Sequence, residues 1–394
     1  MNRHSLNMND HVRGSVFFTD DGTREYFFTI CAEQGETFED ELASLYRHYS
    51  AAMESYGLSE NTLVFGRFYL SDIANEKDIL RKAPIFGLIK KSAVSTIQQC
   101  PLEGGSVCLL VYHIRRNGDS FEKTVMSFDG DNRRNGALIH GTHYDLLWVA
   151  NFFGVGEFDS YSQTGEIFSL FEHVLSDNGM NLLDNAVRTW VYVRDVDNHY
   201  RGMVESRKEF FARHGLTTET RYIASTGIEG FSKEVDSIVS FDAFAIKNLL
   251  PEQIVRMEAL ENLSTTIKYG VTFERGTRIR FGDRSHLHLS GTASIDKNGD
   301  VLHLFDPREQ TRRTIENIRA LLKPHGAGLE DMAYMIVYIR NHKDKDKVMD
   351  ILRAELPESL PFHFLEGAVC RPSWLVELEG VAIIDDDTEF PPFF

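Results

Sequence analysis

Three consecutive segments decide the fold of this chain: HLHLSGTASI (286–295), EQTRRTIENIRALL (309–322) and MIVYIRN (335–341). The first segment alternates leucine with polar residues, which is typical of a half-buried strand. The second repeats isoleucine and leucine at spacings of three, three and one, which predicts a helix with one apolar stripe. Gly326 ends that helix, because glycine readily adopts the left-handed conformation in which chains leave helices. The third segment is rich in β-branched and aromatic residues and predicts a second strand.

The same unit recurs twice upstream. In each copy a helix-like segment leads to a glycine, and a tyrosine within a strand-like run follows 12 or 13 residues later. Self-similarity of this kind indicates repeated structural units. The glycine and tyrosine pairs are Gly57 with Tyr69, Gly179 with Tyr192, and Gly326 with Tyr338.

We therefore expect three divergent units of one α/β (α+β) type that together fill the chain. Their expected bounds are residues 13–126, 127–255 and 256–388. A chain of 394 residues exceeds what one hydrophobic core usually serves, which agrees with several packed units. The acidic segment DDDTE (385–389) near the C-terminus is expected to be a surface tail.

The composition restricts the class of protein. No apolar run approaches the roughly 18 residues of a membrane span, so no membrane association is expected. The N-terminus lacks a secretory signal and the four cysteines are scattered, which together predict a reducing cytoplasm. The formal charge of −17 argues against a general nucleic-acid surface. A local group of arginines can still bind a small anionic metabolite.

The third unit contains four motifs in the order SGTASID (290–296), QT (310–311), VYIR (337–340), and CRP (370–372) with LVELE (375–379). In these motifs and their order the unit resembles the RidA (YjgF/YER057c/UK114) family. Members of that family are small enzymes or binding proteins of chorismate mutase-like fold, which form trimeric barrels with ligand clefts between neighbouring subunits. The resemblance implies that three tandem RidA-like units form an intramolecular pseudo-trimeric barrel, self-contained and able to exist as a monomer.

Further motifs lie in the second and third units: RTW (188–190), TGI (226–228), FERG (273–276) and the CRP ending. They carry a narrower resemblance to the chorismatases, RidA-like enzymes that hydrolyse or rearrange chorismate with release of pyruvate. This resemblance implies a chorismatase-like hydrolase or lyase that acts on a small carboxylated metabolite such as chorismate, in a cleft between the second and third units. The first unit lacks the SGT and CRP motifs and is expected to be a structural partner.

Glu377 and Glu379 are the candidate catalytic residues. They lie two apart on a predicted strand, so both carboxylates point to the same face. The resemblance implies that one of them is a general acid or base, as the corresponding family glutamate is. The alternative is a structural carboxylate paired with Arg371 or Arg280 across the barrel. The sequence leaves open which of the two glutamates is catalytic.

The candidate substrate-binding residues come from two units. Arg371, fixed by Pro372, can hold a substrate carboxylate through a bidentate pair, and a structural salt bridge is the alternative. RidA deaminases bind this carboxylate with an arginine that segment 361–365 lacks, and Arg221 of the second unit stands in the comparable place. Backbone N–H groups and hydroxyls of two turns can bind an oxyanion or carboxylate. The residues of these turns are Ser290, Gly291, Thr292, Thr226 and Gly227.

No metal and no other cofactor is predicted. Two histidine pairs, at 286 and 288 and at 140 and 143, lie in different units with no third ligand in view. Cys370 precedes Arg371 and is interpreted as a small buried residue rather than a nucleophile. Two further functions stay open. A RidA-type deaminase of enamines or imines would release ammonia, and a non-catalytic protein would bind a small ligand unchanged.

Overall fold

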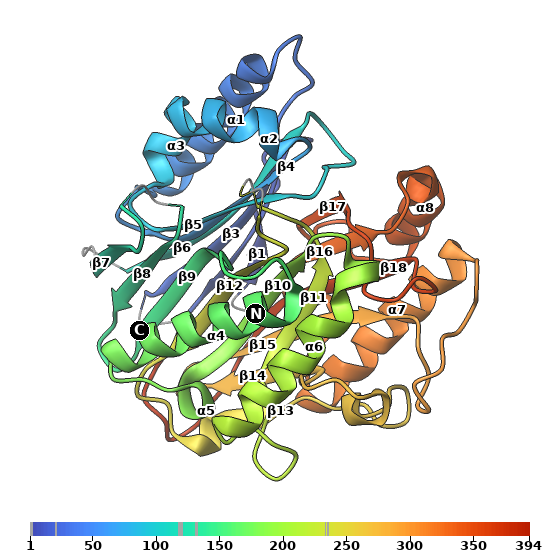
Figure 1. Cartoon of the computed structure of the whole chain (residues 1–394). Coiled ribbons are helices and arrows are strands. Elements are labelled where there is room, and N and C mark those ends of the chain that lie inside the picture. The colour runs from blue at the N-terminus through green and yellow to red at the C-terminus, as the bar shows by residue number, and fades with distance from the viewer. Residues whose placement is uncertain (1–2, 20–21, 117–120, 131–132, 233, 235) are drawn as a thin grey trace.

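The computed structural model describes residues 3–19, 22–116, 121–130, 133–232, 234 and 236–394. They form three six-stranded mixed sheets with helices on one face of each (Figure 1). The strands follow one topology three times: an antiparallel ladder of three, the unit's last strand, then two parallel strands at the far edge. The predicted α+β class and the three tandem units are confirmed.

The first sheet has the order β1-β2-β3-β6-β4-β5. Its helices pack on the outer face, and α1 begins with a capping box in which Thr37 and Asp40 exchange hydrogen bonds. Its strands are β1 (Arg3–Ser5), β2 (Val12–Phe18), β3 (Arg24–Cys31), β4 (Leu63–Leu70), β5 (Ala93–Gln98) and β6 (Val107–Arg115), and its helices are α1 (Phe38–Tyr56), α2 (Ile73–Lys82) and α3 (Pro84–Ile89).

The second and third sheets have the orders β11-β10-β12-β9-β8-β7 and β13-β14-β15-β18-β16-β17. The second comprises β7 (Glu122–Ser127), β8 (Asn135–His140), β9 (Asp145–Phe153), β10 (Ala186–Val193), β11 (Ala224–Glu229) and β12 (Val239–Ile246), with α4 (Ser160–Asp177), α5 (Leu182–Asn185) and α6 (Val196–Arg213). The third comprises β13 (Ile254–Arg256), β14 (Gly276–Arg280), β15 (Arg284–Ala293), β16 (Met332–Ile339), β17 (Phe362–Glu366) and β18 (Val376–Asp385), with α7 (Pro307–Leu322) and α8 (Lys345–Glu355).

The repeated glycine and tyrosine mark the same place in each unit. Gly57, Gly179 and Gly326 have φ angles of 61°, 69° and 73°, a left-handed region that favours glycine over residues with a Cβ. Each tyrosine then lies on the strand next to the unit's last strand, with its side chain buried. The repeat in the sequence therefore corresponds to one helix-to-strand connection that all three units share.

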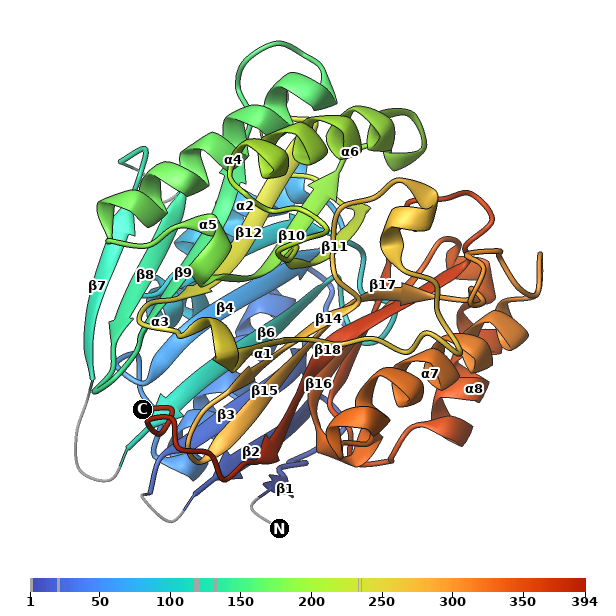
Figure 2. The ribbon, with the colours of Figure 1, turned by 90° about the horizontal axis from the view of Figure 1, so that it is seen from below.

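The three sheets pack in a cycle. β5 of the first unit lies against β8 and β9 of the second, β11 of the second lies against β14 and β15 of the third, and β16 of the third contacts β2 and β3 of the first. Figures 1 and 2 show the sheets facing one another with the helices outside. The inner faces share one hydrophobic core, in which the Trp148 ring centroid lies 4.4 Å from Phe65 and 4.5 Å from Phe244. The pseudo-trimeric arrangement is as predicted.

The expected surface tail at the C-terminus is wrong in part. Asp386 is paired with Arg278 at 2.7 Å, and the following aromatic residues return to the protein interior. The exposed fraction is 0% for Phe393 and 4% for Phe394. The Phe393 ring centroid lies 4.6 Å from that of His286, so the end of the chain closes part of the core.

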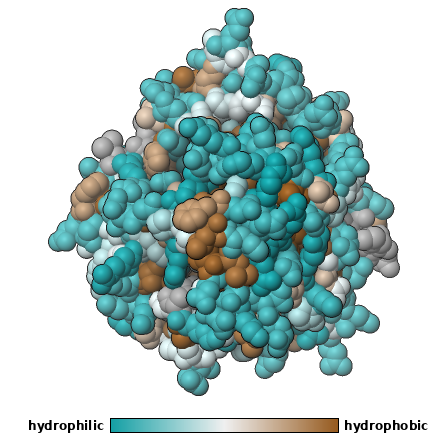
Figure 3. All heavy atoms as spheres, turned by 90° about the vertical axis from the view of Figure 1, so that its right-hand side faces the viewer, coloured by the Kyte–Doolittle hydropathy of each residue, from teal (hydrophilic) through white to brown (hydrophobic). Residues whose placement is uncertain are grey.

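The face that carries α7 and α8 is mainly hydrophilic, with a small hydrophobic patch near its middle (Figure 3). Within the described ranges, no helix combines the length and apolar content needed to cross a membrane.

Candidate active site

A cleft opens where edge strand β11 of the second unit meets the third unit. Bridges from Ala224 to Glu274 and from Ile228 to Val369 join the two units on either side. We call this the 2/3 cleft. Its walls come from α6 and β11 on one side and from β15, β18 and the loop before β18 on the other, and its cavity volume is roughly 20 Å³. A small cavity thus lies at the predicted position between the second and third units.

Glu377 forms the floor of the 2/3 cleft. Its side chain is 4% exposed and accepts no hydrogen bond from a described residue. The carboxyl lies directly on Gly291, where any Cβ would collide with it. Burial, and then the neighbouring Glu379 carboxylate, raise the pKa of Glu377 to about 8. Glu377 is therefore protonated at neutral pH and able to donate a proton into the cleft.

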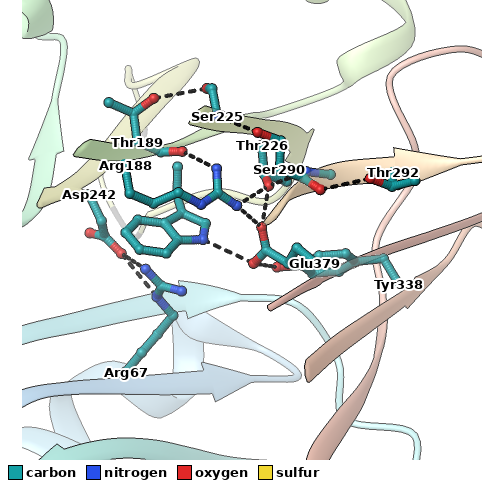
Figure 4. A network of polar contacts seen from close by, with 12 residues as sticks. Arg67, Arg188, Thr189, Ser225, Thr226, Asp242, Ser290, Thr292, Tyr338 and Glu379 are labelled. Carbon is teal, nitrogen blue, oxygen red and sulfur yellow. Dashed lines mark hydrogen bonds and ion pairs between the residues drawn. The ribbon is translucent and has the colours of Figure 1, made fainter. Parts of the chain in front are cut away.

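Glu379 has a different environment although it lies on the same strand face. Its carboxylate pairs with Arg188 at 2.5 Å and accepts hydrogen bonds from Trp190 Nε1 and Tyr338 Oη, each at 2.9 Å, and from Thr226. These groups converge on the carboxylate from two units (Figure 4). Its oxygens are thus occupied, and the alternative of a structural ion pair fits Glu379, with Arg188 as the partner in place of Arg371 or Arg280.

A second buried ion pair lies beside this network. Arg67 of the first unit binds Asp242 of the second at 2.9 Å, with both side chains almost completely buried (Figure 4). The Arg67 guanidinium also lies 4.5 Å from the Trp190 ring. Asp242 faces Trp190 across the sheet as Glu379 faces Ile336, so the two carboxylates hold matching register positions. Both pairs join neighbouring units at the centre of the molecule.

Three arginines surround the 2/3 cleft: Arg207, Arg275 and Arg371. Arg207, on α6, is 1% exposed, and its Nη1 donates to Ser225 Oγ at 3.3 Å. Its Nε and Nη2 have no hydrogen-bond partner among the described residues. Burial lowers the pKa of Arg207, yet a guanidinium stays charged at physiological pH. A buried cation with unused donors is a strong site for a substrate carboxylate.

Aromatic rings complete the walls. Phe273 lies between two of the arginines, with its ring centroid 5.9 Å from Arg207 Cζ and 5.6 Å from Arg275 Cζ. Trp374 lies 5.3 Å from Arg371 Cζ. The cleft therefore combines positive charge, aromatic surface and one neutral carboxyl group.

Of the residues predicted to bind substrate, some line the cleft and others form hydrogen bonds within the protein. Gly291 and Gly227 line the 2/3 cleft, as does Arg371. The Ser290 hydroxyl instead accepts from Ser225 N at 2.9 Å and donates to a backbone carbonyl. The Thr292 hydroxyl donates to the Ser290 carbonyl at 3.0 Å. The Ser290 hydroxyl thus joins β15 to β11, the Thr292 hydroxyl bonds within β15, and neither residue lines the cleft.

Thr226 and Arg221 likewise form hydrogen bonds within the protein and do not line the cleft. Thr226 Oγ1 accepts from Gly291 N at 2.9 Å in addition to its bond with Glu379. Arg221 is directed away from the cleft, and its Nη2 and Nη1 donate to the carbonyls of Ala186 at 2.6 Å and Leu183 at 3.3 Å. The structure does not bring Arg221 to Glu377, because these carbonyls at the end of α5 hold its guanidinium.

Arg207 occupies the place expected for Arg221, and sequence reasoning missed it. One signal was available, since Met203, Arg207, Phe210 and Phe211 fall on one buried stripe of α6. An arginine within such a stripe needs either an internal partner or a ligand.

Cys370 also lines the cleft. Burial raises the pKa of its thiol to about 12. The thiol is therefore protonated at neutral pH, which argues against a nucleophile, and the residue is partly rather than fully buried.

Comparisons with known proteins agree with this architecture. Residues 279–384 match the family model described as Endoribonuclease L-PSP, which confirms the resemblance of the third unit to the RidA family. The 3-aminoacrylate deaminase RutC of Acinetobacter baylyi (strain ATCC 33305 / BD413 / ADP1) is 28% identical over 97 residues, which are 24% of this chain and 77% of the relative.

Among solved structures, a chorismatase matches with a TM-score of 0.62 over 82% of this chain and 93% of its own length. The sequence identity is 18%, so the likeness concerns the fold alone. The tandem arrangement of RidA-like units described above is thus a chorismatase-like fold.

Proposed function

We propose that this chain is a chorismatase-like hydrolase or lyase that acts on a small carboxylated metabolite such as chorismate and releases pyruvate in the 2/3 cleft. The observation that carries the proposal is Glu377, a buried and protonated carboxyl that faces a cleft with three arginines. A neutral acid beside cations is the arrangement needed to protonate a bound anion.

The residues of the cleft fit the hydrolysis of an enol ether. Arg207 and Arg371 would hold the substrate carboxylates. Glu377 would transfer its proton to the methylene carbon of the enolpyruvyl group, which leaves an oxocarbenium ion. Water adds to that cation, and the resulting hemiketal collapses to pyruvate and a ring hydroxyl. The proton lost by the water returns to Glu377, so each turnover consumes one water and restores the acid.

The test is a product assay with the full chain. Chorismate and isochorismate are incubated with the protein, and pyruvate is measured with lactate dehydrogenase against protein-free substrate. We expect pyruvate release above the spontaneous rate, without ammonia. If neither substrate yields pyruvate faster than the protein-free control, the proposed activity is wrong.

A second candidate is a deaminase of enamines or imines, which the relationship to RutC favours. The two activities differ in their products, because hydrolysis of an enamine or imine releases ammonia. Ammonia from 3-aminoacrylate, with no pyruvate from chorismate, would favour the deaminase. Binding of an aromatic acid without any product would indicate a ligand-binding protein.

A further inference from the structure

The pseudo-threefold arrangement creates a counterpart of the 2/3 cleft between the third and first units. There the bridge from Leu365 to Pro101 corresponds to that from Ile228 to Val369. A cavity of roughly 160 Å³ opens where β17 meets β2 and β3. We call it the 3/1 cleft. Its residues can be compared with those of the 2/3 cleft by sheet register.

At two matching register positions the 2/3 cleft has side chains with oxygen atoms, whereas the third and first units have a thiol and an imidazole. Cys108 faces Tyr69 across the sheet as Glu377 faces Tyr338, so a thiol stands where the 2/3 cleft has its acid. Cys31 is the register partner of Cys108. His363 takes the position on β17 that Thr226 has on β11. Two thiols and an imidazole therefore converge by sheet register.

These three groups are close enough to share one metal ion. Their ligand atoms all lie within 4.8 Å of one another, and Cys31 Sγ is 3.8 Å from His363 Nδ1. Tetrahedral zinc with ordinary bond lengths separates a sulfur and a nitrogen ligand by roughly 3.6 Å. Cys108 and His363 are buried, whereas Cys31 lines the open cleft. The group therefore has one side that a fourth ligand can reach.

The charges around the 3/1 cleft also differ from those of the 2/3 cleft. Glu103 lies two residues beyond Pro101, as Arg371 lies two residues beyond Val369, so a carboxylate replaces a cation at the mouth. Asp10 lines the same cavity, and Arg13 is the one arginine among the described residues that line it. Three arginines line the 2/3 cleft. The change favours a cationic occupant.

We propose that Cys31, Cys108 and His363 bind one zinc ion in the 3/1 cleft, with a fourth coordination position open to the cavity. Both thiols bind as thiolates, so binding releases their protons to solvent, and His363 binds through neutral Nδ1. Two thiolates and an imidazole favour zinc over calcium or magnesium, which prefer oxygen ligands. Nothing in this site depends on the proposed chemistry of the 2/3 cleft.

Cobalt titration of the reduced, metal-free full chain tests the proposal. Co²⁺ bound by thiolates shows a sulfur-to-cobalt charge-transfer band, which zinc should abolish by displacement. We expect this band in the wild type and in Cys100→Ser, a matched control outside the cluster, and its loss in Cys31→Ser. Absence of the band in the wild type, or its persistence in Cys31→Ser, would overturn the proposal. Metal held only by the more exposed group of His11, Glu33 and His48 would give no such band, which also overturns it.

A second measurement avoids the risk that a core variant fails to fold. Wild-type protein is treated with a thiol alkylating reagent with and without zinc, and modification is mapped by mass spectrometry. We expect zinc to abolish alkylation at Cys31 but not at Cys100. Equal modification of Cys31 in both samples, or a disulfide between Cys31 and Cys108 that re-forms in the presence of zinc, would contradict the site.

Discussion

The 2/3 and 3/1 clefts share one backbone frame but have different side chains. At one register position the first has Glu377 and the second has Cys108. At the mouth the first has Arg371 and the second has Glu103. A homotrimer would have to carry the same residues in all its clefts. Fusion of three units into one chain removes that constraint, so each cleft can acquire its own chemistry through a few substitutions.

The interface between the first and second units differs from both clefts, because asparagine side chains join its two sheets. Asn151, in a left-handed conformation with φ of 58°, accepts from Thr96 N at 2.8 Å and donates to Val94 O at 3.0 Å. Asn135 forms a reciprocal pair of hydrogen bonds with Val94. These amides fasten β5 to the neighbouring sheet. Ser240 occupies the register position of Glu377, so this position has neither the acid nor the thiol.

The largest expected effect is a loss of turnover when the acid of the 2/3 cleft is removed, with no effect on the 3/1 cleft. Glu377→Gln keeps the size of the side chain but removes the proton donor. We expect kcat for pyruvate release from chorismate to fall by about 10²–10⁴-fold, the usual contribution of general acid catalysis. The charge-transfer band of cobalt in the 3/1 cleft should be unchanged. Steady-state assays and the cobalt titration check the two expectations together.

The matched control is Glu316→Gln on α7, whose side chain is 58% exposed. It should retain the activity of the wild type. Unchanged turnover in Glu377→Gln would remove the acid role and with it the contrast between the clefts.

The next effect concerns the ion pairs at the centre of the molecule. Arg188→Met leaves the Glu379 carboxylate buried without its cation, which typically costs about 3–5 kcal/mol of unfolding free energy. Arg308→Met breaks the exposed pair with Asp350 and should cost less than about 1 kcal/mol. Urea denaturation of both variants measures the difference. Equal midpoints would show that the Arg188 pair does not join the second and third units in the way described.

The raised pKa of Glu377 should also make the unfolding free energy depend on pH. The pKa of Glu377 is about 8 in the folded protein and 4.5 in its ordinary state, so the folded protein binds the extra proton between these values. Stability should therefore fall as pH rises from about 4.5 to 8. Glu377→Gln lacks this penalty and should be more stable than wild type by up to roughly 3 kcal/mol at pH 7.

Thermal unfolding of both proteins from pH 5 to pH 9 measures this difference. The two melting temperatures should nearly coincide at the acidic end and separate toward pH 8. Parallel curves across the whole range would mean that Glu377 is ionised in the folded protein.

The fold was predictable from sequence because its evidence is local. The helix before Gly326 and the strand after it have strong periodicity, and the same connection recurs at Gly57 and Gly179. The assignment of the two glutamates was not predictable. Both point to one strand face, and only the approach of Arg188 from another unit separates an ion-paired Glu379 from a free Glu377.

The remaining differences also arise from contacts between units. Arg221 was expected in the cleft, but backbone carbonyls of its own unit hold it, and no local pattern encodes that choice. Cys31, Cys108 and His363 are scattered along the chain without a metal-ligand spacing. Only the pairing of β3 with β6, and the packing of β17 beside them, brings these residues together.

The smallest predicted effect, on substrate affinity, tests whether positive charge defines the 2/3 cleft. Arg207→Met removes a buried guanidinium with two unused nitrogens, and a hydrogen bond to a charged group is worth about 1.5–3 kcal/mol. KM for chorismate should rise about 10–100-fold, with a smaller change in kcat. Arg201→Met lies on the same helix with a side chain that is 88% exposed, and its KM should match the wild type. If both variants bind chorismate as the wild type does, Arg207 holds no carboxylate, and the contrast with the 3/1 cleft depends on Glu377, Arg275 and Arg371.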